Sequence, residues 1–184
     1  MTKVAKGKPR RTGLERLDVL VVDDNRHMRE LMKVILDGLG VGGIRAVATA
    51  EAGLAEVAMK APDIIFVDWM MEPIDGMGFV TRVRSDEASP ARFVPIIMIT
   101  GHTEASRVAA ARDGGVTEFL AKPVSARQIA QRLESVIHNP RPFVRTRMYF
   151  GPDRRRRDVE FPGSEKRASR RRGGARIAAA EPVE

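Results

Sequence analysis

The chain of 184 residues contains no cysteine, and only 5% of its residues are aromatic. A disulfide framework and a thiolate metal site are therefore excluded. Its apolar runs stop at about five or six residues, far below the roughly 18 that span a bilayer, so we expect no membrane insertion. No secretory-type apolar stretch follows the basic N-terminal residues, and we therefore expect a cytoplasmic location.

Positive charge is concentrated at both ends of the chain. The net charge of +8 divides into +5 over residues 1–13, −4 over 14–138 and +7 over 139–184. After position 139, prolines interrupt any helical pattern and apolar residues are too few for a second core. We therefore expect a disordered basic arm over residues 1–16, a folded domain over 17–138, and an arginine-rich tail over 139–184 that is mostly disordered.

Short apolar runs alternate with helical patterns through the middle of the chain. The predicted strands cover residues 19–22, 44–47, 64–67, 96–99 and 118–121. The predicted helices cover residues 28–39, 50–60, 78–84, 103–113 and 125–137. This alternation predicts an α/β fold with a parallel sheet that is covered on both faces. Ligands of such sheets bind beyond the carboxyl ends of the strands.

Carboxylates follow two of the predicted strands. Asp23 and Asp24 come directly after the first strand, and Asp68 comes directly after the third. Packing does not require acidic side chains at these positions, although paired acids after a strand often only cap the next helix. Because the carboxyl ends of parallel strands meet at one edge of the sheet, the three acids indicate a site for a hard cation or a phosphate.

A hydroxyl group and an ammonium group complete the pattern. Thr100 ends the fourth strand, Lys122 ends the fifth strand, and Phe119 lies three residues before the lysine. In the order and spacing of these residues and the three acids, residues 17–138 resemble the receiver domain of two-component response regulators. The resemblance implies a flavodoxin-like, doubly wound sheet of five parallel strands in the order 2-1-3-4-5, with five helices.

The resemblance also implies a role for each residue. Asp68 is the implied acceptor of a phosphoryl group from a histidine kinase or a phosphotransfer protein. The implied cofactor is Mg²⁺, held by Asp23, Asp24, Asp68 and the backbone carbonyl of Met70. Thr100 and Lys122 would bind phosphoryl oxygens, and Phe119 would move into the space that Thr100 leaves.

The resemblance implies a stand-alone response regulator. We expect it to signal to a downstream protein partner, with a homodimer through helix 4, strand 5 and helix 5 as a further expectation. We do not expect an enzyme in the usual sense. A phosphatase or transferase of similar fold is the rival interpretation, but such enzymes usually carry an acid where this chain has Met70.

The tail contains two arginine clusters with no assigned role. They are Arg154, Arg155, Arg156 and Arg157, followed by Arg170, Arg171 and Arg172. Basic runs near an aromatic residue bind phosphates and stack on bases, so nucleic acid and a cyclic dinucleotide are both candidate partners. In that interpretation the tail is the effector and phosphorylation gates it. The alternative is a solvated tail that aids solubility or folds back onto the acidic domain.

Overall fold

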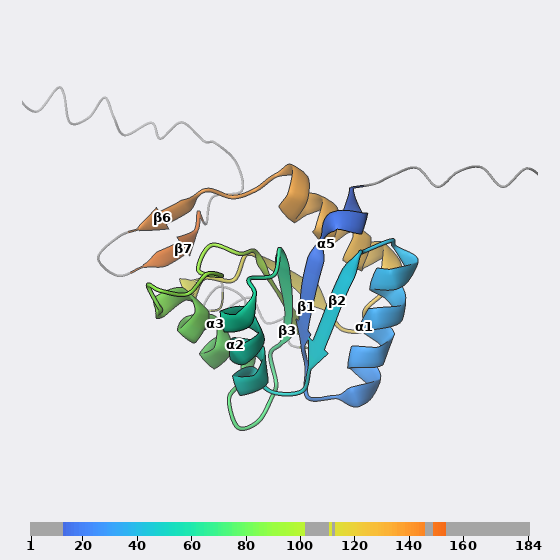
Figure 1. Ribbon diagram of the computed structural model, residues 1–184, viewed down its shortest axis with the longest axis horizontal. Helices are drawn as coiled ribbons and strands as arrows, with labels where there is room; N and C mark the ends of the chain where they lie inside the picture. The colour runs from blue at the N-terminus through green and yellow to red at the C-terminus, as the bar shows by residue number, and fades with distance from the viewer. Residues whose placement is uncertain (1–12, 102–110, 112, 146–148, 154–184) are drawn as a thin grey trace, which may run out of the picture. The chain divides into compact units, whose positions relative to one another are not determined.

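The computed structural model describes residues 13–101, 111, 113–145 and 149–153. Five parallel strands form one sheet in the order β2-β1-β3-β4-β5 (Figure 1). They are β1 (Asp18–Val22), β2 (Gly43–Val47), β3 (Ile64–Asp68), β4 (Ile96–Thr100) and β5 (Glu118–Ala121). The flavodoxin-like order that the resemblance implies is therefore confirmed, and every predicted strand lies within one residue of its observed bounds.

Four of the five predicted helices lie in the described part of the chain. They are α1 (Arg26–Gly38), α2 (Ala50–Met59), α3 (Gly76–Ser85) and α5 (Ala126–His138). Each begins after a side chain that accepts hydrogen bonds from free backbone N–H groups, namely Asn25, Thr49, Asp75 and Ser125. The helix predicted over residues 103–113 lies outside the described residues, apart from positions 111 and 113. None of the helices in the described ranges combines the length and apolar character needed to cross a bilayer.

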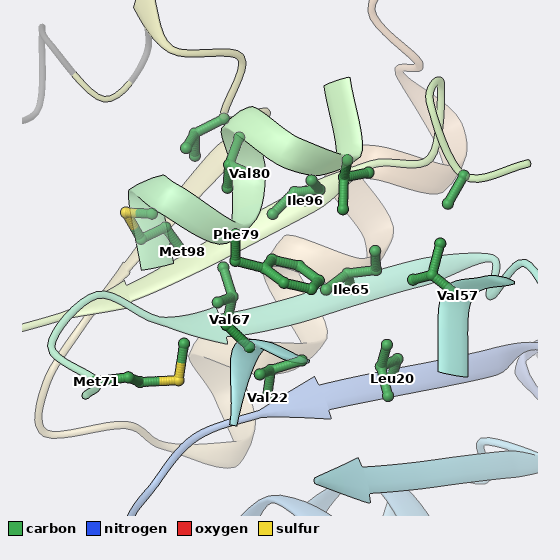
Figure 2. Close-up of a cluster of buried hydrophobic side chains, with 14 of the residues drawn as sticks. Leu20, Val22, Val57, Ile65, Val67, Met71, Phe79, Val80, Ile96 and Met98 are labelled. Atoms are coloured by element: carbon green, nitrogen blue, oxygen red, sulfur yellow. The ribbon is translucent and has the colours of Figure 1, made fainter. Parts of the chain in front are cut away.

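The two faces of the sheet carry separate apolar cores. Leu20 and Val22 of β1 belong to the first core, which lies beneath α2 and α3. The alternate residues Val19 and Val21 belong to the second core, which lies beneath α1 and α5. Figure 2 shows Phe79 of α3 lying over the strands of the first core. Because all residues of β3 and β4 are buried, these strands are held on both sides and their ends are fixed in position.

Ordered elements lie on both sides of the domain predicted over residues 17–138. A 3₁₀ turn, η1 (Leu14–Arg16), precedes β1, and Leu14 packs against the second core. After α5, β6 (Phe143–Arg145) pairs antiparallel with β7 (Phe150–Pro152). This hairpin is stabilised by contacts with α3 and the start of β5, which local composition does not reveal. Residues 1–12 and 154–184 lie outside the described residues.

Truncation of Phe79 tests the first core. This ring is fully buried, so Phe79→Ala should lower the free energy of unfolding by about 3–5 kcal/mol, the usual range for a buried phenylalanine. Met59→Ala is the control, because that side chain is exposed and its loss should change stability by less than about 0.5 kcal/mol. Urea denaturation measures both variants, and equal effects would contradict the packing described here.

Candidate functional site

Three carboxylates meet at the carboxyl edge of the sheet. Asp23 and Asp24 follow β1 and Asp68 ends β3, and these two strands are paired directly. One carboxylate oxygen from each residue lies within 4.8 Å of the other two. Asp23 is 0% exposed and Asp68 is 3% exposed, whereas Asp24 is exposed. The structure thus brings together the three acids that the sequence predicts.

The loop between β1 and α1 is held by hydrogen bonds to its backbone. The backbone N–H of Asn25 donates to Asp23 Oδ1 at 2.8 Å. Arg29 Nη1, from the first turns of α1, donates to the backbone carbonyls of Asp23 and Asp24 at 2.7 and 2.9 Å. Sequence reasoning assigned no role to Arg29. Its position five residues after Asp24, one helical turn past the cap, is the signal that was available.

Lys122 supplies the positive charge of the site. Its Nζ lies 2.9 Å from Asp68 Oδ1, and the lysine side chain is partly exposed. The backbone N–H of Lys122 donates to the carbonyl of Thr100 at 2.8 Å, which continues the pairing of β4 and β5 beyond Ala121. This ion pair joins the ends of β3 and β5 across β4. The predicted convergence of Asp68 and Lys122 is therefore observed.

Thr100 and Phe119 lie on the neighbouring strands β4 and β5. Thr100 is buried at the end of β4 and follows Ile99, the residue that pairs with Asp68. Phe119 pairs with Met98, two positions back along β4, and packs partly buried against the first core. The two residues are thus placed as the sequence predicts, while their roles as a switch remain predictions.

A glycine permits the tight path of the loop after β3. A Cβ on Gly76 would clash with the carbonyl oxygen of Asp68, so a larger residue would displace the backbone of Asp68. The N–H of Gly76 donates to the carbonyl of Trp69 at 2.9 Å and closes the loop. Met70 lies in this loop with its side chain 60% exposed. The role of the Met70 carbonyl as a metal ligand remains a prediction. The tail arginines from Arg154 onward lie outside the described residues.

Burial weakens Asp23 as an acid. The pKa of Asp23 is raised to about 6, mainly by burial and to a smaller extent by the nearby charges of Asp68 and Asp24. The N–H of Asn25 and the ammonium group of Lys122 oppose this shift. Asp23 Oδ2 is also buried without a hydrogen-bond partner among the described residues. An orphaned carboxylate oxygen beside two further carboxylates fits a hard divalent cation such as Mg²⁺, which prefers oxygen ligands.

An acidic edge with a paired lysine, on a sheet of this strand order, defines the chain as a receiver module of the α/β class. The family model described as the response regulator receiver domain matches residues 19–134. The chain belongs to this family, and it contains a receiver domain of the two-component response regulators.

The chain covers nearly the whole length of one relative and about half the length of another. The chain is 33% identical over 122 residues to the chemotaxis protein CheY1 of Helicobacter pylori, covering 66% of this chain and 97% of that protein. It is 31% identical over 124 residues to the phosphate regulon transcriptional regulatory protein PhoB of Pseudomonas aeruginosa, covering 67% of this chain. The chain spans about half the length of PhoB, 53%.

Solved structures show the same fold. The chemotaxis protein CheY4 of Vibrio cholerae superimposes with a TM-score of 0.62 at 27% identity, covering 66% of this chain and 98% of that one. The receiver domain of NtrX from Brucella abortus gives a TM-score of 0.60 at 27% identity, covering 66% of this chain and 99% of that one. The similarity thus covers about two thirds of the chain.

Replacement of Asp23 tests the electrostatic cost of the buried acid. The folded-state pKa of about 6 exceeds the ordinary value of 3.8. The contribution of protonated Asp23 to the free energy of unfolding is therefore fully present below pH 3.8 and is lost as the pH rises through 6. In chelator-treated protein, Asp23→Asn should therefore raise the free energy of unfolding at pH 7.5 by up to about 3 kcal/mol. The gain should shrink below pH 6 and vanish near pH 4.

The matched control is Asp37→Asn, because Asp37 is an exposed residue of α1. Its replacement should change the stability by less than about 0.5 kcal/mol at every pH. Urea denaturation between pH 4 and pH 8 measures both variants. A loss of stability in Asp23→Asn at pH 7.5, or a gain that does not depend on pH, would contradict the proposed cost.

Proposed function

We propose that the chain is a phosphoacceptor regulator in which Asp68 receives a phosphoryl group from a histidine kinase or a phosphotransfer protein. The observation that carries this proposal is the contact of 2.9 Å between Lys122 Nζ and Asp68 Oδ1 within the acidic cluster. The lysine orients the acceptor carboxylate and partly neutralises the site. Membership of the receiver family supports the same assignment.

The transfer requires an attack in line with the bond that breaks. A carboxylate oxygen of Asp68 forms a bond to phosphorus while the bond from phosphorus to the donor histidine nitrogen breaks, and the electron pair of that bond returns to the nitrogen. The product is an acyl phosphate. Lys122 then pairs with an oxygen of the transferred group, and the hydroxyl of Thr100 donates to another oxygen.

Mg²⁺ is the cofactor that fits the acidic cluster. Asp24 and Asp68 are the proposed direct ligands together with the carbonyl of Met70, and Asp23 is the proposed ligand through water. When bound, the ion offsets the negative charge of the incoming phosphoryl group. Without the ion, Asp23 and its neighbours repel the anionic donor. The cluster and its orphaned Asp23 Oδ2 support this assignment.

Phosphorylation is proposed to act as a switch. The modification adds a charge of about −1.5 to −2 beside Thr100 and draws its hydroxyl inward. Phe119, two strand positions back from Ala121, then moves toward the space that is vacated. The altered surface around β5 and α5 signals to a downstream protein or forms a homodimer. The chain itself is proposed to turn over no separate substrate.

Replacement of the acceptor tests this function. Wild-type protein incubated with acetyl phosphate and MgCl₂ should gain one phosphoryl group, and Asp68→Asn should gain none because it lacks the carboxylate that forms the acyl phosphate. Intact-protein mass spectrometry measures the modification. The control Asp37→Asn should be modified like wild type, and labelling of Asp68→Asn would refute the assignment.

A magnesium titration tests the cation site separately. Trp69 is the only tryptophan of the chain and directly follows Asp68, so its fluorescence should report binding at the cluster. Asp24→Asn should raise the dissociation constant for Mg²⁺ at least about tenfold, because one carboxylate charge is lost. Asp37→Asn should bind as wild type does. Equal affinity in Asp24→Asn would exclude this cluster as the cation site.

A further inference from the structure

A cavity of about 270 Å³ lies at the amino edge of the sheet, where α3 contacts the hairpin. Arg84 and Ser85 of α3 line it together with Tyr149 and Phe150 from the hairpin segment. This volume is close to the roughly 300 Å³ at the lower end of the range for small-molecule sites. The cavity therefore suits a small ligand, and it lies at the opposite end of the strands from Asp68.

Arg84 brings a buried positive charge to this cavity. It is 4% exposed, and its N–H groups donate to four backbone carbonyls, those of Ala91, Arg92, Val94 and Gly115. A guanidinium group has five N–H donors, so one on Nη2 has no acceptor in the described part of the chain. Burial lowers the pKa of Arg84 to about 9, and no carboxylate of the described residues offsets this effect. A buried charge that is held only by neutral groups favours the approach of an anion.

Arg92, in the turn before β4, adds a second guanidinium group. Its Nε donates to the carbonyl of Arg84 at 3.1 Å, and the central carbon of the group lies 4.1 Å from the ring centroid of Phe150. Nη1 lies 3.5 Å from a carboxylate oxygen of Glu87, which also contacts Arg145. The side chain of Glu87 is 68% exposed, so water competes for both ion pairs. Nη2 forms no hydrogen bond or ion pair within the described ranges, so it remains a donor for a ligand.

Negative charge at the cavity is limited to its rim. Asp113 is the only acid among the described residues that line the cavity, and it is exposed. Its charge is therefore weakened by water, whereas the charge of Arg84 is buried. Residues 14–138 are acidic overall, with a net charge of −4. The cavity is thus a local basic site in an acidic domain.

We propose that this cavity binds a phosphate group, either as inorganic phosphate or as the phosphate of a small monoester. The remaining N–H groups of Arg84 and Arg92 donate to phosphate oxygens, and the hydroxyl of Thr81, which also lines the cavity, donates to another. Phosphate carries up to about two negative charges for the two guanidinium groups, which favours it over a monocarboxylate. A bound phosphate joins α3 to the hairpin. This site is separate from Asp68 and does not depend on the proposed phosphorylation.

Isothermal titration calorimetry of the full chain with sodium phosphate tests the proposal. A chelator removes Mg²⁺ from the acidic edge, and a constant ionic strength keeps the screening equal in all titrations. Arg92→Gln should raise the dissociation constant of phosphate at least about tenfold, because a charged hydrogen-bond donor is lost. The matched control is Arg26→Gln, because Arg26 is an exposed residue of α1 and its replacement should have no effect.

Replacement of the acid at the rim should change the affinity in the opposite direction. Asp113→Asn should lower the dissociation constant about 2- to 5-fold, because a charge that repels phosphate is removed. Asp37→Asn on α1 is the control and should bind phosphate as wild type does. Asp113 is exposed, so this variant tests the site even if circular dichroism shows that Arg92→Gln is unfolded.

Two results would place the phosphate elsewhere and overturn the proposal. Unchanged affinity in folded Arg92→Gln and in Asp113→Asn would assign the binding to another part of the chain, such as the arginines that follow Asp153. Loss of binding in Lys122→Gln would assign it to the acidic edge.

Three probes distinguish the possible ligands. Acetate should bind at least about tenfold more weakly than phosphate, because it carries less charge and fewer oxygens. Tighter binding of ribose 5-phosphate than of inorganic phosphate identifies a monoester as the ligand, and weaker binding identifies inorganic phosphate. Saturation with phosphate should also slow the hydrogen exchange of the amides in β6 and β7, because the bound group stabilises the hairpin. The proposal is overturned if millimolar phosphate shows no saturable binding, if acetate binds as tightly, or if the exchange in the saturated protein is unchanged.

Discussion

The repulsion among three carboxylates at one edge of the sheet is the constraint on which the rest of the structure depends. Their oxygens lie within 4.8 Å of one another, and Asp23 is removed from water. Lys122 compensates only part of this charge, through its contact with Asp68. The edge therefore keeps an excess of negative charge. Any change in the net charge of the edge alters the forces on the surrounding strand ends.

A rigid sheet is needed to keep the acids in this unfavourable arrangement. β1 and β3 are paired along their length, so Asp23 and Asp68 cannot move apart without breaking that ladder. Two apolar cores, one on each face, supply the stabilisation that offsets the electrostatic cost. Gly76 allows the loop after β3 to pass close to the backbone of Asp68. The two apolar cores thus supply the stability, and the electrostatic repulsion is limited to the carboxyl edge of the sheet.

The sequence predicts the sheet and its acidic edge because both follow from local patterns. Apolar runs locate the strands, and a side chain directly after a run must lie at the edge, as Asp68 does. The hairpin after α5 was missed because its stabilisation is non-local. Phe143 and Phe150 pack on Arg84 and Arg92, which lie about 50 residues or more earlier in the chain. The contact of Arg29 with the carbonyls of Asp23 and Asp24 likewise depends on geometry that spacing alone does not specify.

The hairpin of β6 and β7 lies at the amino edge of the sheet, away from the acidic cluster. Gly151 of β7 lies against Gly115, just before β5, so the chain leaves the domain near the amino edge. The five residues of a strand separate the two edges by about 16 Å. The contacts that hold the hairpin are therefore separate from the acidic cluster, so they add to the stability of the domain without adding positive charge beside Asp68.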